Sequence, residues 1–205
     1  MGVKIKIKQV IFEIEYLLII TLLVSSISKT VMAYLNKYYI CLLFVIYHEL
    51  SHIFVGNIVG KKIRKIFLGI SGMTAYFKYE YLEKKRIDYC KECIVYFAGP
   101  ISNIIMAILF YKSKFIFEIN LFLAFLNLLP IYPLDGYNIL KSILRIIFVK
   151  KSHILTNVTN IISMIFLTLL VISCTIIFLK YKNLFSVIYL LYILIINIRN
   201  NGKIP

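Results

Sequence analysis

The chain contains few of the residues that build soluble or disulfide-bonded domains. Its 205 residues include four cysteines, four prolines and only nine acidic residues. The cysteines form no framework, because Cys90 and Cys93 in CKEC make a single pair, and one CxxC motif without a second is a weak indication of zinc or redox chemistry. We interpret all four as ordinary residues. The sequence also shows no internal repeat, no low-complexity tract and no room for a soluble domain after the last apolar run.

Apolar residues are abundant instead. They make up 61% of the chain, and the mean hydropathy of +0.88 is far above that of ordinary soluble domains. Charged residues divide the sequence into six apolar runs, each near the ~20 residues that a membrane-spanning helix needs. The runs cover residues 16–27, 38–59, 93–111, 115–140, 154–179 and 184–198. The sequence therefore predicts an all-α multi-pass membrane protein with six transmembrane helices.

The basic residues orient these helices, because Lys and Arg accumulate in cytoplasmic loops. With the N-terminus inside, 18 of the 24 lysines and arginines fall in cytoplasmic segments, so both termini are expected in the cytoplasm. A signal peptide ending at VSSIS is an alternative for the first run, and its cleavage would leave the other five spans oriented as before. The net charge of +15 fits loops that meet anionic lipid headgroups, so we assign no nucleic-acid role.

The one sizeable polar segment covers residues 61–92. Its first part mixes glycines with β-branched and aromatic residues, a composition that favours short strands joined at glycines. We therefore predict a small membrane-associated β segment near residues 63–80. An unstructured loop is the alternative.

The motif HELSH, at residues 48–52, places two histidines and a glutamate inside the second apolar run. Residues four apart project from the same face of a helix, so His48 and His52 can both offer an imidazole to one metal ion, with Glu49 beside a bound water. This is the arrangement of zinc hydrolases. The alternative is a polar cluster satisfied by neighbouring helices, but three ionisable groups on one turn at membrane depth are costly and usually functional.

A catalytic zinc site normally has three protein ligands. The strongest third candidate is Asp135, an acid well inside another apolar run, in the segment NLLPIYPLDG. Pro130 and Pro133 break the helix there, and irregular backbone survives in a membrane only where it is buried against protein or lines a wet cavity. His153, which borders a basic loop, and Glu118, which approaches the opposite face, are weaker alternatives.

Three motifs in this order resemble those of the site-2 proteases, a family of intramembrane zinc metalloproteases. They are HELSH, AGPISN at residues 98–103 and NLLPIYPLDG at residues 127–136. The motifs touch three of the six predicted spans. The resemblance also implies that Gly99, Pro100 and Asn103 shape the packing of helices beside the site.

The same resemblance assigns roles to individual residues. It implies one zinc ion (Zn2+) per chain, held by His48, His52 and Asp135. It implies that Glu49 is the general base and that Asn127 lies near the bound substrate.

Within this family the chain is most similar to the stage IV sporulation proteases of endospore-forming bacteria. That similarity implies cleavage of a membrane-tethered, inactive pro-sigma factor, control by inhibitory membrane proteins and a place in the bacterial cell membrane. Residues 1–205 would form a single integral membrane metalloprotease domain, with a catalytic core at about residues 38–140 and no PDZ or CBS domain. Ser51 and Tyr137 stand where family glycines are common, which affects at most the fit of the substrate.

Two other functions stay open on the sequence. A metal-ion transporter would also use intramembrane His and Asp, although it has little need of Glu49. A catalytically inactive membrane scaffold would bind the substrate or the inhibitors, and an intact Glu49 argues against it. If the chain is a protease, residues 69–79 are expected to pair with the substrate as an added strand, because a peptide is cut only when its backbone is extended.

Overall fold

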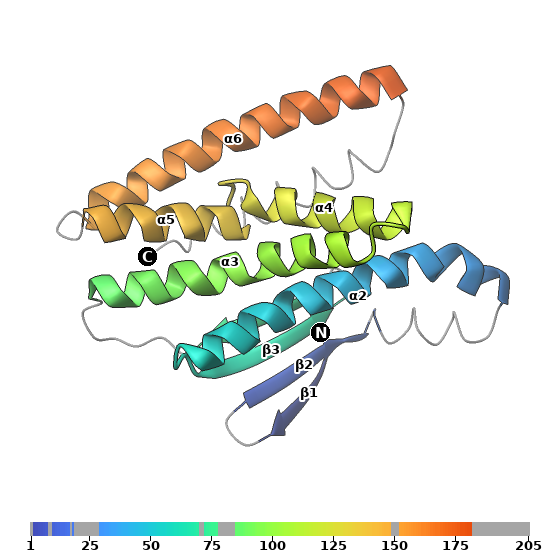
Figure 1. The fold of residues 1–205 in the computed structure, drawn as a ribbon, viewed down its shortest axis with the longest axis horizontal. Coiled ribbons are helices and arrows are strands. Elements are labelled where there is room, and N and C mark those ends of the chain that lie inside the picture. Colours follow the sequence, from blue (N-terminus) through green and yellow to red (C-terminus); the bar gives the residue numbers. More distant parts are fainter. Residues whose placement is uncertain are drawn as a thin grey trace. The chain divides into compact units, whose positions relative to one another are not determined.

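The computed structural model describes residues 2–7, 10–16, 18, 29–69, 72–77, 85–148 and 152–181. This part of the chain is mostly helical (Figure 1). The strands are β1 (Gly2–Ile7), β2 (Val10–Glu15), β3 (Ile63–Gly69) and β4 (Gly72–Phe77). The helices are α2 (Lys29–Ile58), α3 (Arg86–Leu109), α4 (Lys114–Leu128), α5 (Asp135–Ile147) and α6 (Ser152–Tyr181).

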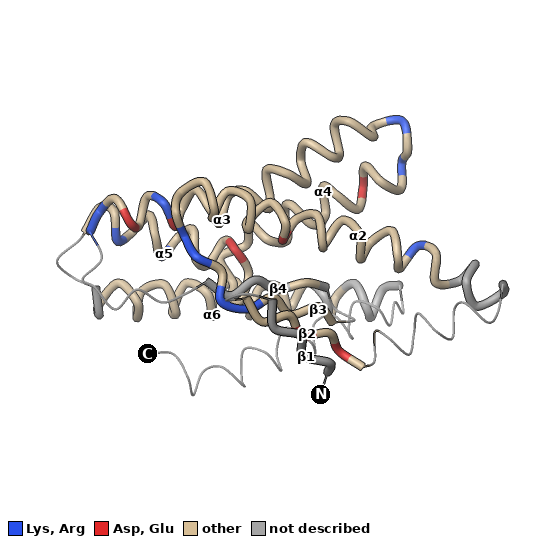
Figure 2. The backbone as a smooth tube through the Cα atoms, turned by 90° about the horizontal axis from the view of Figure 1, so that it is seen from below, with Lys and Arg blue, Asp and Glu red and all other residues tan. Residues whose placement is uncertain are grey.

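Three helical stretches are long and apolar enough to cross a membrane, namely Leu35–Ile58, Arg86–Leu109 and Ile154–Ser173. They correspond to the second, third and fifth predicted runs. Lys and Arg lie mainly near helix ends and in the segments that join the helices (Figure 2), as expected where apolar stretches face lipid. The first and sixth predicted runs fall almost wholly outside the described residues. Within the described residues, three helices are thus candidate membrane spans, and the six-span prediction is not tested in full.

The fourth predicted run is two short helices separated by a break. The first, α4, ends at Leu128, and α5 begins at Asp135. The segment between them closes through local turns, in which the Ile131 N–H bonds Leu129 O at 2.8 Å and the Leu134 N–H bonds Ile131 O at 2.8 Å. The prolines of this segment cannot donate such bonds, which is why a continuous helix is not possible here. The predicted break is therefore confirmed.

The predicted β segment is also present, but it is part of a larger sheet. The four strands have the order β1-β2-β3-β4, with antiparallel pairs at both ends and a parallel pair, β2 with β3, between them. The loop alternative is wrong for β3 and β4. The N-terminal hairpin was not predicted, since Lys4 and Lys6 were counted only as basic residues of a cytoplasmic segment. The alternation in GVKIKI is the period-two pattern of a strand and could have found it.

The chain divides into two compact units, residues 1–84 with 94–125 and residues 85–93 with 126–205. In the first unit, α2 contacts β4, and Phe44, Val95 and Ala124 are buried. An ion pair between Lys65 and Glu13 joins β3 to β2. In the second unit, α5 packs against α6. Ile131, in the segment before α5, forms a buried apolar cluster with Leu167 of α6. The first unit carries the HELSH motif and the second carries the PLDG motif.

Candidate metal centre

His48 and His52 lie one turn apart on α2, and only 4% and 5% of their surfaces are exposed. The regular helix brings them together, as their spacing predicts. Their Nε2 atoms are 3.1 Å apart. The two rings meet edge to face, with centroids 4.8 Å apart. One nitrogen of each ring therefore points toward the same place.

The other nitrogen of each ring is bound by α3. His52 Nδ1 donates a hydrogen bond of 2.7 Å to the backbone carbonyl of Val95. His48 Nδ1 donates one of 2.9 Å to Asn103 Oδ1. Because carbonyl oxygens only accept, the proton of each neutral ring resides on Nδ1 and the lone pair on Nε2. Partners of this kind fix the tautomer and the orientation of metal-binding histidines.

The paired Nε2 atoms fit a zinc ion. Two lone pairs that face each other across 3.1 Å repel unless a cation lies next to both. Two nitrogens on one tetrahedral zinc ion, each at ~2.0–2.1 Å, are about 3.3–3.4 Å apart, which is close to the observed separation. Gly99 of α3 provides the room for this pair, because a Cβ at that position would collide with both imidazole rings. The glycine of AGPISN therefore lets α3 approach the histidines closely.

Asp135 is the first residue of α5, directly after the break. Two contacts with α6 hold this region in place. The backbone N–H of Tyr132 donates to Ser163 Oγ at 2.9 Å, and the Tyr137 hydroxyl donates to Asn160 Oδ1 at 2.6 Å. Tyr137 is only 2% exposed, so the residue that stands in place of a common family glycine is a buried anchor between α5 and α6.

The predicted ligands form a group that can hold a metal ion. A ring nitrogen of His48, a ring nitrogen of His52 and a carboxylate oxygen of Asp135 all lie within 4.8 Å of one another. Two imidazoles and one carboxylate are a common ligand set of catalytic zinc, which keeps its fourth position for water or substrate. The assignment of these three residues as the actual ligands stays a prediction.

Of the two alternative third ligands, Glu118 is not in this group. Glu118 is exposed and pairs with Lys114 on the same helix, at 3.8 Å. The side chain of His153 lies outside the described part of the chain.

Comparisons with known proteins found similarities in sequence and in fold. A family model described as Peptidase family M50 matches residues 111–173, which include Asp135. This part of the chain is therefore similar to that peptidase family. A zinc metalloprotease of Methanocaldococcus jannaschii is 30% identical over 150 residues, which are 65% of this chain and 42% of that protein. The chain thus spans less than half the length of this relative.

A solved structure is similar in fold to this chain. It is a site-2 protease from Methanocaldococcus jannaschii, with a TM-score of 0.59 and 24% sequence identity. The likeness covers 94% of this chain and 92% of the other. The two chains therefore share a fold.

The two remaining predicted residues of the candidate site lie close in sequence to its ligand candidates. Glu49 follows His48 on α2 and is half-buried, and Asn127 lies in the last turn of α4, also half-buried. Their roles as general base and substrate contact stay predictions.

Sequence reasoning missed two functional features of the site. Asn103 was given only a packing role, whereas its Oδ1 accepts a hydrogen bond from His48 Nδ1. Asn120, which donates to the carbonyl of Ile116 and accepts from Asn103, was not noticed at all. An asparagine inside an apolar run is itself a signal, since polar side chains at membrane depth need partners.

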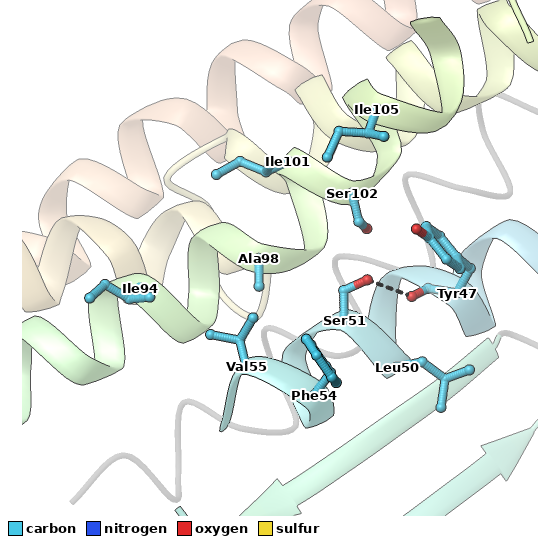
Figure 3. A pocket seen from close by; sticks show the side chains of 10 residues that line it. All are labelled: Tyr47, Leu50, Ser51, Phe54, Val55, Ile94, Ala98, Ile101, Ser102 and Ile105. Carbon is cyan, nitrogen blue, oxygen red and sulfur yellow. Dashed lines mark hydrogen bonds between the residues drawn. The ribbon is translucent and has the colours of Figure 1, made fainter. Parts of the chain in front are cut away.

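A pocket of about 500 Å³ lies between α2 and α3, next to the histidine face (Figure 3). Two serines contribute to its lining, but both hydroxyls are already bonded: Ser51 donates to Tyr47 O at 2.9 Å and Ser102 donates to Gly99 O at 2.7 Å. The remaining side chains are apolar or aromatic. The lining is Tyr47, Leu50, Ser51, Phe54, Val55, Ile94, Ala98, Ile101, Ser102 and Ile105. No Asp, Glu, His, Lys or Arg lines this pocket, and most of its lining is apolar.

Proposed function

We propose that the protein is an intramembrane zinc metalloprotease of the site-2 type, which hydrolyses a peptide bond of a membrane-associated protein in or near the cytoplasmic half of the bilayer. One observation carries this proposal. The two buried histidines of HELSH both donate from Nδ1 to α3, so both Nε2 atoms are available to one ion. The match to a peptidase family and the acid that follows the first histidine support hydrolysis over other uses of the ion.

The chain's own residues supply the rest of the chemistry. Zinc, when bound, lowers the pKa of a coordinated water toward ~7 and polarises a scissile carbonyl. His48, His52 and Asp135 would hold the ion. Glu49 would accept the proton of the attacking water and return it to the leaving amine. The apolar helices around these residues would restrict water to the path that serves the reaction.

A Glu49→Gln variant tests the proposal. The amide resembles the carboxylate in shape but cannot accept the water's proton, so zinc content and substrate association should persist while turnover falls by about 10²–10⁴-fold. The measurement is the appearance of a shorter product from a co-expressed, membrane-tethered pro-protein, together with zinc analysis of the purified variant. Cleavage by Glu49→Gln at the wild-type rate would exclude this mechanism. Zinc transport by a chain that cuts nothing would favour the transporter.

We further propose that the substrate is presented as a strand along β4. This strand is an edge of the described sheet and contacts α2, the helix that carries the histidines. In an antiparallel ladder, hydrogen-bonded and non-bonded pairs alternate, so successive β4 residues direct their N–H groups toward β3 and away from it. Single proline substitutions at Met73, Thr74 and Ala75 should therefore alternate in effect. Those on the outer edge should reduce cleavage yet spare the fold and zinc content.

The cellular role is a narrower proposal. We propose processing of an inactive pro-sigma factor during sporulation, at the bacterial cell membrane and under inhibitory membrane partners, on the strength of the sequence resemblance alone. Co-expression with a candidate pro-sigma factor should yield the shortened form with the wild type and not with Glu49→Gln. A chain that cuts other membrane-tethered proteins but leaves every pro-sigma factor intact would exclude the role and keep the chemistry.

We also propose the full six-span layout with both termini in the cytoplasm. The test uses a chain whose native cysteines are replaced, with Lys62→Cys or Lys182→Cys added. Lys62 is exposed directly after α2, and Lys182 follows α6 in the sequence. A thiol reagent that cannot cross the membrane should label position 182 and spare position 62 in intact cells. The opposite labelling would overturn the orientation.

A further inference from the structure

A buried chain of hydrogen bonds leads from His48 on α2 through α3 to α4. His48 Nδ1 bonds Asn103 Oδ1 at 2.9 Å, and Asn103 Nδ2 bonds Asn120 Oδ1 at 3.3 Å. Asn120 Nδ2 then bonds the backbone carbonyl of Ile116 at 2.9 Å. Both asparagines are fully buried, with 0% of their surfaces exposed. This chain of hydrogen bonds thus connects α2, α3 and α4 within one compact unit.

The direction of these bonds is set at the α4 end. The Ile116 carbonyl only accepts, so the amide NH2 of Asn120 must face it and Oδ1 must face Asn103. That oxygen then requires the NH2 group of Asn103, which turns Asn103 Oδ1 toward His48. The proton of His48 is held on Nδ1 as a result, and Nε2 keeps its lone pair. One backbone carbonyl of α4 therefore decides which nitrogen of His48 is available to an ion.

The other histidine is controlled differently. His52 Nδ1 donates directly to the backbone carbonyl of Val95. A backbone carbonyl can only accept a hydrogen bond, and a change of the Val95 side chain does not remove it. Asn103 could present either its oxygen or its NH2 group to His48, because its two ends have nearly the same shape. The wrong orientation would place the proton of His48 on Nε2. A histidine oriented by an asparagine needs a further residue to fix that asparagine.

We propose that Asn120 is a positioning residue for the metal centre: through Asn103 it holds His48 in the tautomer whose Nε2 can bind a metal ion. The inference rests on the proposed zinc site for its consequence, although the hydrogen-bond chain exists without an ion. Asn120 touches neither the candidate ligands nor the general base. Its effect on the site is confined to His48, because His52 has its own backbone partner.

Two substitutions at position 120 separate orientation from packing. Asn120→Leu keeps the size of the side chain but removes the oxygen that accepts from Asn103, so Asn103 is no longer fixed. Asn120→Asp restores the hydrogen bonds, since burial favours the neutral acid, whose O–H can donate to Ile116 O while its carbonyl faces Asn103. Ser102→Ala is the matched control, because Ser102 is a buried polar residue beside Asn103 whose hydroxyl bonds only the local carbonyl of Gly99.

The direct readout is the tautomer of His48 in metal-free protein. The chain has three histidines, so a His153→Gln background labelled with ¹⁵N-histidine reports on His48 and His52 alone. Wild type, Asn120→Asp and Ser102→Ala should show both rings protonated on Nδ1. Asn120→Leu should show one ring with a substantial Nε2-protonated fraction and the other unchanged. Zinc affinity should fall about tenfold in Asn120→Leu, at the lower end of the 10–100-fold range for outer partners of metal ligands, and further in Asn103→Leu.

The outcomes distinguish this inference from the proposed function. Unchanged tautomers and zinc affinity in Asn120→Leu, or an equal loss in Asn120→Asp and Asn120→Leu, would overturn the positioning role. If the leucine variant does not fold, Asn120→Ala removes the same oxygen without added bulk and answers the same question. If wild type binds zinc but cuts nothing, the proteolytic function fails while the tautomer measurement still decides the role of Asn120.

Discussion

The two halves of the candidate centre are held in different ways. His48 and His52 sit within an uninterrupted helix, and their outer nitrogens are bound by α3. Asp135 begins a helix directly after an irregular segment. That segment bonds Ser163 of α6 through Tyr132, and α5 itself bonds Asn160 of α6 through Tyr137. The histidine half is therefore positioned by regular geometry and side-chain orientation. The aspartate half is positioned by the end of α4 and the start of α5.

This difference determines which changes each half tolerates. A continuous helix keeps its histidines on one face even when a neighbour is altered, so changes beside it should act on ring orientation. An irregular segment in an apolar setting depends on each partner of its backbone, because unsatisfied backbone groups there are costly. We therefore expect metal-specific defects around the histidines and combined defects in stability and metal binding around Asp135.

The largest expected effect comes from removing a ligand. Single substitutions His48→Ala, His52→Ala and Asp135→Ala should each abolish most zinc binding, because two of three protein ligands do not coordinate the ion adequately. The measurement is the zinc content of purified protein, which should be close to one per chain in the wild type. A normal zinc content in Asp135→Ala would show that Asp135 is not a ligand and that the third ligand is another residue.

The second prediction uses the two close-packed glycines. A Cβ at Gly99 would collide with the imidazole rings, whereas a Cβ at Gly136 would collide with the backbone of Leu128 and Leu129. Gly99→Ala should therefore displace the rings and lower zinc affinity at least about tenfold, like the loss of an orienting partner. Gly136→Ala should lower the free energy of unfolding by about 1–3 kcal/mol, the usual cost of overpacking. It should also lower zinc affinity.

Zinc titration and thermal unfolding of both variants in detergent check this contrast. Gly60 supplies a third glycine with nothing within 4 Å of an added Cβ, although its φ of 84° makes a side chain strained for another reason. Ala98→Gly, beside Gly99, is the better control for a change in this part of α3 without added bulk. Equal unfolding temperatures and equal zinc affinities for Gly99→Ala and Gly136→Ala would mean that the two halves are not held differently.

The contrast also explains how far the sequence alone could lead. The four-residue spacing in HELSH is a property of one helix, so the shared face of His48 and His52 could be predicted without any tertiary information. The break before Asp135 could be predicted too, since prolines lack the N–H that a helix requires. Asp135 could be proposed as the third ligand because it is an acid well inside a broken apolar run, and the family resemblance supported that choice.

What sequence reasoning missed depends on packing between helices. The role of Asn103 follows from its place opposite His48, and that of Asn120 from its place opposite Asn103. Neither place can be read from one helix at a time. The N-terminal hairpin was missed for a different reason. Its lysines were considered only as charges, and their alternation with isoleucines was not considered. Lys4 and Lys6 lie on β1, which pairs with β2 at the edge of the described sheet.

The smallest expected effects concern the anchors of the aspartate half. Tyr137→Phe removes the hydroxyl that donates to Asn160 at 2.6 Å, and Ser163→Ala removes the acceptor of the Tyr132 N–H. Each should lower the free energy of unfolding by about 1 kcal/mol, the net value of one hydrogen bond. Thr168→Ala on α6, whose exposed hydroxyl bonds only the Ile165 carbonyl, is the matched control and should change little. Denaturant titration measures the three differences. If Ser163→Ala is no more destabilising than Thr168→Ala, then α6 does not hold the irregular segment, and the break before Asp135 is maintained by its own turns.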